Sequence, residues 1–226
     1  MVEPKFATLT SQSAIFEKNQ AFYEKQKTAF EASPWAKNLL TAVWPTGHVA
    51  PDTTHGATPL ERDGAKMFVV EMPTFTVRKE QLLDLLDFTR NNSEFQYNFL
   101  LDLTALDFLK SPRAEDKTEN DNKRFQMVYL FRSQVPERRS TKLRICVPVD
   151  EGEEVPSLTK VWVGANWPER EVFDLMGIRF TNHPNLRRIM MPDNYRGHPL
   201  RKDFPVKGIG EDYLIEDLLY KRRNVD

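Results

Sequence analysis

Three acidic residues, Glu169, Glu171 and Asp174, lie close enough in the sequence to suggest acid–base chemistry. Neighbouring carboxyl groups can act as a general acid and a general base, and His183 could carry a proton beside them. On a helix, however, residues four positions apart face the same side, so Arg170 can form an ion pair with Asp174. The spacing therefore favours a charged, locally paired first helical turn. A stand-alone enzyme that uses Glu169, Glu171 or His183 stays open as an alternative.

Other kinds of active site find little support in the sequence. It contains no glycine-rich phosphate loop and no Gly-x-Ser-x-Gly nucleophile motif. His48, His55, His183 and His198 are not at metal-ligand spacing from one another or from a cysteine. Cys146, the single cysteine, lies among apolar neighbours, which is typical of an inert buried thiol, and it cannot hold an iron–sulfur cluster alone. We therefore expect no metal or cluster site in this chain.

Charge is distributed unevenly along the chain. The net charge is −1, but residues 179–210 hold seven Lys or Arg against two Asp, a local charge of +5. The same segment contains His183-Pro184, His198-Pro199 and Phe204-Pro205, and each of these pairs favours extended backbone. Because such a segment cannot build a core of its own, it must lie on another surface. We favour a partner protein over the chain's own domain; an anionic lipid or a nucleic acid is a weaker alternative, since the net charge is near zero.

The elements that position these residues follow from the hydrophobic pattern. A helix is expected from Ser11 or Ser13 to about Ser33, and residues 45–65 are expected to form a loop. The further expected elements are a strand at 67–70, a helix at 77–90 that buries Leu82, Leu83, Leu85 and Leu86, alternating strands at 95–103, 125–131 and 143–149, and a helical stretch from Pro156-Ser157. Alternation at 95–103 predicts that Phe99 and Leu101 are buried.

This order of elements predicts an α+β fold: a mainly antiparallel sheet with helices on one face, an N-terminal helix and an extended C-terminal arm. We divide the chain into an N-terminal helical segment and loop at 1–65, a core domain at 66–178, and a basic docking arm and tail at 179–226. Asn166 is expected to cap a helix, with Glu169 reaching back to the cap and Gly177 ending the helix. No apolar run approaches the ~20 residues that span a bilayer.

Three sequence blocks carry a resemblance to a known family. They are ANWPEREVFDLMGI at 165–178, HPNLRRIM at 183–190 and GHPLRKDFP at 197–205. In this order and spacing they resemble the 30-kilodalton subunit of respiratory complex I, also called its C subunit, and the resemblance extends over about residues 66–207. The motif residues that we expect at interfaces are Trp167, Glu169, Arg170, Glu171, Asp174, Gly177, His183, Pro184, Arg187, Arg188, His198, Pro199, Leu200, Arg201, Lys202 and Asp203.

The resemblance implies a non-catalytic structural and assembly subunit in the peripheral arm of NADH:quinone oxidoreductase. Its neighbour would be the large quinone-site subunit, and proton-translocating electron transfer would belong to the whole complex. The resemblance implies no catalytic residue and no cofactor in this chain, with FMN and iron–sulfur clusters in partner subunits. It implies a peripheral position on the cytoplasmic face of a bacterial inner membrane. The equivalent subunit of a membrane-bound hydrogenase, or of another quinone-linked complex, is the alternative.

Overall fold

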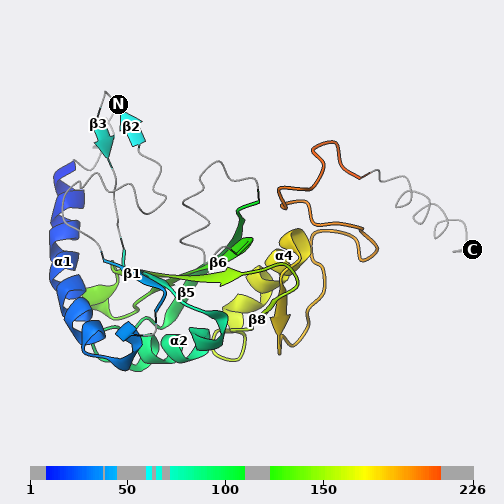
Figure 1. The fold of residues 1–226 in the computed structure, drawn as a ribbon. Coiled ribbons are helices and arrows are strands. Elements are labelled where there is room, and N and C mark those ends of the chain that lie inside the picture. The colour runs from blue at the N-terminus through cyan, green and yellow to red at the C-terminus, as the bar shows by residue number, and fades with distance from the viewer. Residues whose placement is uncertain are drawn as a thin grey trace, which may run out of the picture.

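The computed structural model describes residues 9–37, 39–44, 60–62, 65–67, 72–109 and 123–209 (Figure 1). Within these residues the largest sheet has the strand order β1-β4-β7-β6-β5. Its strands are β1 (Thr41–Val43), β4 (Thr74–Thr76), β5 (Phe99–Asp107), β6 (Phe125–Arg132) and β7 (Lys142–Val149). Only the β4–β7 pair is parallel among these neighbours, so the expected mainly antiparallel sheet is confirmed.

Helices cover one face of this sheet. They are α1 (Leu9–Glu31), α2 (Leu82–Asn91) and α4 (Asn166–Met176). Phe30 of α1, Leu86 of α2 and Val172 of α4 belong to the same buried cluster as the inward-facing strand residues. The minor elements are the hairpin β2 (Leu60–Arg62) and β3 (Ala65–Met67), the parallel pair β8 (Glu154–Pro156) and β9 (Arg179–Thr181), and 3-10 turns at Pro34–Lys37, Lys79–Gln81, Pro136–Arg138 and Val163–Ala165.

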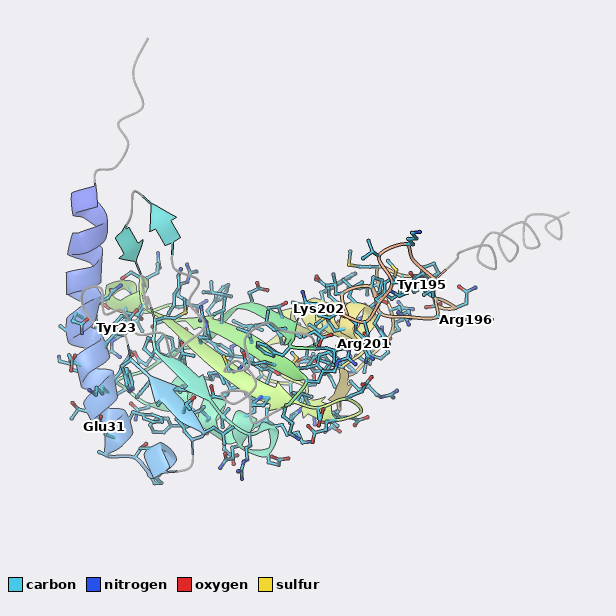
Figure 2. All side chains as sticks on the ribbon, turned by 45° about the horizontal axis from the view of Figure 1, so that its top comes forward. Tyr23, Glu31, Tyr195, Arg196, Arg201 and Lys202 are labelled. Atoms are coloured by element: carbon cyan, nitrogen blue, oxygen red, sulfur yellow. The ribbon has the colours of Figure 1, made fainter. Side chains whose placement is uncertain are left out.

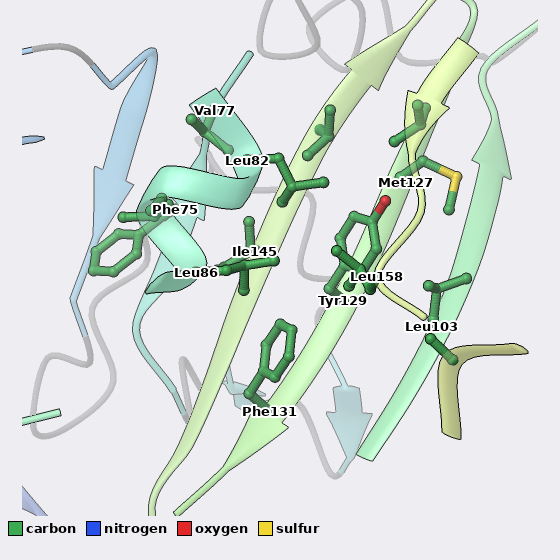
Figure 3. Packing of buried hydrophobic residues seen from close by; sticks show 14 of the residues in the cluster. Phe75, Val77, Leu82, Leu86, Leu103, Met127, Tyr129, Phe131, Ile145 and Leu158 are labelled. Carbon is green, nitrogen blue, oxygen red and sulfur yellow. The ribbon is translucent and has the colours of Figure 1, made fainter. Parts of the chain in front are cut away.

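Strict alternation of apolar residues builds the centre of the core. Every second residue of β6, from Phe125 to Phe131, is buried, and β6 pairs with β7 as the expected antiparallel hairpin. Leu82 and Leu86 of α2 lie over Phe75 and Ile145, as Figure 3 shows. Full burial of one such side chain contributes about 1.5–3 kcal/mol. The apolar alternation at 125–131 and 143–149 in the sequence therefore determines which face of the sheet is buried.

Strand β5 departs from the alternation that its sequence suggests. Leu100 pairs with Phe131, but Asp102 pairs with Leu130, so Leu101 occupies a bulge. A bulge adds one residue to the strand, so even-numbered residues face the core on one side of it and odd-numbered residues on the other. As a result Phe99 and Leu101 are 38% exposed, and the expectation that both are buried is wrong.

Several expected boundaries also shift. Helix α1 begins at Leu9 and ends at Glu31. Leu83 is 42% exposed because Leu82, Leu85, Leu86 and Thr89 form the buried side of α2.

The helix expected from Pro156-Ser157 is absent: Pro156 ends β8, and the Ser157 amide donates to the carbonyl of Thr181 at the end of β9. Part of the loop expected at 45–65 forms β2 and the start of β3. The strand expected at 67–70 lies largely outside the described residues.

The bulge in β5 gives a matched pair of leucines for a stability test. Replacement of the buried Leu103 by Ala should lower the free energy of unfolding by ~2–5 kcal/mol, because it removes core contacts and leaves a cavity. Leu101→Ala, on the exposed side of the same strand, should cost under about 1 kcal/mol. Urea unfolding of both variants measures the difference. Equal losses would contradict the assigned bulge.

Candidate functional site

Residues 182–209, here called the strap, follow β9 and lie over helix α4. The strap is the orange segment of Figure 1, and its Tyr195, Arg201 and Lys202 lie at the opposite end of the molecule from α1 (Figure 2). It contains no helix or strand, so its backbone polar groups need other partners. Helix α4 supplies many of them.

The carboxylate of Asp174 is the main anchor of the strap. Its Oδ2 accepts hydrogen bonds from the consecutive backbone amides of Ile189 (3.0 Å), Met190 (2.7 Å) and Met191 (2.9 Å). Its Oδ1 accepts one from the guanidinium of Arg188 at 2.6 Å. Burial alone would raise the pKa of this carboxyl, but the hydrogen bonds from Met191, Met190 and Arg188 lower it below its usual range. Asp174 is therefore a buried, ionised and fully paired anion.

Two arginines connect α4 to the strap in opposite directions. Arg170 of the helix donates to the strap carbonyls of Arg187 (3.0 Å) and Arg188 (3.3 Å). Arg188 of the strap donates back to the carbonyl of Asp174, and it also bonds the carbonyls of Tyr195 and Gly197 across its own loop. The expected Arg170–Asp174 pair within the helix is thus replaced by contacts across the helix–strap boundary.

Helix α4 ends at Gly177 as the sequence predicts, and the strap uses the helix end. Gly177 has φ 78°, and a Cβ atom there would meet the side chains of His198 and Arg201 at 2.6–2.7 Å. His198 Nδ1 donates to the carbonyl of Asp174, while the amide of Leu200 donates to that of Leu175. Both the backbone conformation and the close approach therefore require glycine.

A network of charges holds the far end of the strap to the sheet. Arg124, just before β6, bonds Asp107 with two nitrogens, Glu151 at 2.9 Å and Asp203 of the strap at 2.8 Å. Burial would raise the pKa of Asp107, but hydrogen bonds from Arg124 and from the Lys202 and Leu109 amides lower it. The carboxylate of Asp107 is consequently stabilised as an anion.

Strap residues Arg201 and Lys202 join the same network. Arg201 donates to the Met176 carbonyl at 2.6 Å and to Glu151 at 2.7 Å. The backbone amide of Lys202 donates to Asp107 at 2.9 Å, and its side chain is exposed. The strap is therefore ordered by contacts with its own chain, and the preference for a partner protein over the chain's own domain as the surface that supports it is wrong.

Glu169 is a buried acid, and no Lys or Arg side chain among the described residues forms an ion pair with it. Its two oxygens accept hydrogen bonds from the Ser157 hydroxyl (2.7 Å) and the Leu158 amide (2.6 Å). Burial raises the pKa of Glu169 above its usual value. His183 Nε2 lies 3.9 Å away but donates to the carbonyl of Asn166, while its Nδ1 accepts from the Asn185 amide. Because Nδ1 accepts from an N–H group, it carries no proton, and burial also lowers the pKa of His183; the ring therefore forms no ion pair with Glu169.

These contacts correct the predicted helix cap. Asn166 makes no side-chain cap bond and lies within the first turn of α4. Glu169 is fully buried and instead accepts a hydrogen bond from the Leu158 amide in the segment after β8. In the first turn that the sequence predicts to be charged and locally paired, Glu169 and Arg170 are therefore buried and bond residues outside the helix.

The predicted motif residues divide into two groups. The residues that lie between α4, the strap and the core are Glu169, Arg170, Asp174, Gly177, His183, Arg188, His198 and Arg201. The residues with exposed or partly exposed side chains are Trp167, Glu171, Pro184, Arg187, Pro199, Leu200, Lys202 and Asp203. Sequence reasoning missed Asp107, Arg124, Glu151 and Ser157, whose partners lie far away in the sequence and follow no periodic pattern.

Glu169 and Glu171 do not form the acid–base pair that their spacing suggests. Glu171 is exposed, whereas Glu169 is fully buried, so the two acids do not face a common substrate. The described residues contain no group of three or more His, Cys, Asp or Glu placed to hold a metal ion. None of the helices described is long and apolar enough to cross a membrane.

Comparison with known proteins gives a consistent family. Residues 75–209 match the family model for the 30 Kd subunit of respiratory-chain NADH dehydrogenase. The C subunit of NADH-quinone oxidoreductase from Geotalea uraniireducens is 47% identical over 137 residues, which cover 60% of this chain and 74% of the relative. The protein of the same name from Ruegeria pomeroyi is 44% identical over 135 residues, covering 60% of this chain and 61% of the relative.

A solved structure extends the likeness to the fold. A chain of the membrane-bound sulfane sulfur reductase, an archaeal respiratory membrane complex, superposes with a TM-score of 0.51 at 17% identity. The match covers 90% of this chain and 92% of that chain. At this identity the likeness concerns the fold alone.

Opposite pH dependences should separate the two buried acids of α4. Asp174 has a lowered pKa, so its stabilisation is present above the unfolded value of about 3.9 and is lost as pH falls through the folded value. Asp174→Asn should therefore cost ~3–5 kcal/mol near neutral pH and progressively less in acid. Glu169 has a raised pKa, so its stabilisation is present below about 4.3 and is lost as pH rises. Glu169→Gln should gain stability relative to the wild type as pH rises.

Urea unfolding at a series of pH values measures both slopes. Glu171→Gln, which changes an exposed acid of the same helix, is the control. Parallel pH profiles for Asp174→Asn and Glu169→Gln would contradict the assigned environments.

Proposed function

Because the chain belongs to the family of the 30-kilodalton subunit of respiratory-chain NADH dehydrogenase, we propose that it is a non-catalytic docking subunit in the peripheral arm of NADH:quinone oxidoreductase. The complex transfers electrons from NADH to quinone, and this chain holds its neighbours in place. Its main neighbour is the large quinone-site subunit. The observation that carries the proposal is the strap, which is fixed from within and presents side chains that its own fold leaves exposed.

The outer surface of the strap has the composition of a docking surface. Met190, Leu200 and Val206 are exposed by 59%, 56% and 105%, although apolar side chains of this size gain stability when covered. The exposed side chains of Lys202 and Lys207 lie in the same segment. Apolar anchors among cations suit a partner surface with apolar pockets and acidic residues.

The redox chemistry belongs to other subunits in this proposal. FMN and iron–sulfur clusters are bound by partners, and proton translocation is a property of the whole complex. The chain reaches the membrane through its neighbours, on the cytoplasmic face of a bacterial inner membrane, and it binds no nucleic acid. The described residues support this division because their buried acids are committed to holding the strap and the β8 segment.

The alternatives are less well supported. A stand-alone enzyme based on Glu169, Glu171 or His183 has no common site for these three groups, as one acid is buried and the other exposed. An equivalent role in a membrane-bound hydrogenase is not favoured, because relatives at 44–47% identity are named as subunits of NADH-quinone oxidoreductase.

Charge reversal on the outer strap should weaken assembly without unfolding the chain. Arg201 is unsuitable for this test, because its bonds to Met176 and Glu151 hold the strap itself. Lys202→Glu combined with Lys207→Glu changes only exposed side chains. We expect at least about tenfold less recovery with the complex at physiological salt, since like charges would face an acidic partner surface.

The measurement is affinity purification of the tagged chain from gently solubilised membranes, with quinone reductase activity as the second readout. The matched control is Arg139→Glu with Lys142→Glu, which reverses two exposed cations at the β6–β7 hairpin. Recovery of the wild-type chain without flavin and iron–sulfur subunits would overturn the proposed function. Equal recovery of the strap variant and the control would show that the strap is not part of the docking surface.

A further inference from the structure

A second group of exposed apolar side chains lies just before helix α4 and in its first turn. Val161, Val163 and Trp167 are exposed by 42%, 83% and 65% within seven residues of chain. We call these three residues the Trp167 patch. A large aromatic ring and two branched aliphatic side chains in water are unfavourable unless a partner covers them.

The backbone that carries this patch is firmly held. Trp162, next to Val161 and Val163, is buried, donates its indole N–H to the carbonyl of Asn98, and packs its ring 5.1 Å from that of Phe131. Ala165, which lies between Val163 and Trp167 in the sequence, is fully buried. The exposed side chains therefore project from a rigid platform.

The ring of Trp167 is itself braced. The guanidinium of Arg170 lies 5.1 Å from its centroid, which is within the range of a cation–π contact. Arg170 is in turn fixed by the strap carbonyls of Arg187 and Arg188. Ordering of the strap thus holds one face of the indole ring in place while most of the side chain stays open. A surface aromatic residue that is rigid before binding loses little entropy when it binds.

We propose that the Trp167 patch is a second anchor that inserts into an apolar pocket of the same partner subunit that receives the strap. The inference rests on the proposed docking function. Continuity supports it, because the strap begins beside α4, where His183 bonds the carbonyl of Asn166 next to Trp167. Lys160 is exposed next to Val161, and Glu171 is exposed one helical turn after Trp167, so we expect charged groups of both signs at the rim of the pocket.

Hydroxyl-radical footprinting with mass spectrometry tests whether the patch is covered. In the free full-length chain, Trp167 should be oxidised readily, whereas the buried Trp162 serves as an internal reference. In the purified complex, oxidation of Trp167 should fall at least about fivefold, as expected for a fully desolvated anchor. Unchanged oxidation in the complex would overturn the proposal. Protection of Trp167 in the free chain would also overturn the proposal. If dilution abolishes that protection, a second copy covers the patch; if it does not, the chain itself covers it.

Substitution tests the contribution of the anchor to binding. Trp167→Ala should reduce retention in the complex by about 30-fold or more, the scale of a central interface residue, and Trp167→Phe should lose less. The control is Leu83→Ala, which removes an apolar side chain that is 42% exposed on α2. Thermal unfolding of each free variant should match the wild type. Normal retention of Trp167→Ala beside loss for the strap variant would reject this inference alone, whereas failure of the wild-type chain to copurify would reject the docking function itself.

Discussion

The paired burial of Asp174 and the strap amides is the constraint on which the functional end of the molecule depends. A buried carboxylate without donors is strongly unfavourable, and so are three consecutive backbone N–H groups outside any helix or strand. Asp174 and residues 189–191 satisfy each other, and Arg188 neutralises the remaining charge. Because each side supplies the hydrogen bonds that the other needs, neither Asp174 nor the strap amides would be satisfied alone.

This mutual requirement divides the charges of the strap into inner and outer groups. The +5 charge of residues 179–210 suggests a strongly cationic arm when counted along the sequence. In the folded chain, however, Arg188 bonds Asp174 and Arg201 bonds Glu151, so these cations contribute to internal order. The field available to a partner comes mainly from exposed residues such as Lys202 and Lys207. The cationic surface that the strap offers to a partner is therefore smaller than the +5 charge of residues 179–210 implies.

Local patterns predicted the sheet and the end of α4, because their causes are local. Alternation from Phe125 to Val149 reports burial of one sheet face, and Gly177 reports a left-handed helix end. The bulge at Leu101 could not be predicted in this way. It changes which residues of the strand face the core, but it leaves the apolar pattern of the sequence unchanged. The strap contacts were equally hidden. Arg124 finds Asp203 across 79 positions of sequence, and no periodicity encodes such a pair.

An internally ordered strap changes what association with a partner must achieve. A disordered arm would lose backbone entropy on docking, at about 1–2 kcal/mol for each residue that becomes fixed. Here much of that cost is met during folding, through Asp174, Arg170 and the network around Arg124. Arg170 also lies against the ring of Trp167, so one arginine supports both surfaces. Arg170 is thus the residue whose loss would disturb the strap and the Trp167 patch together.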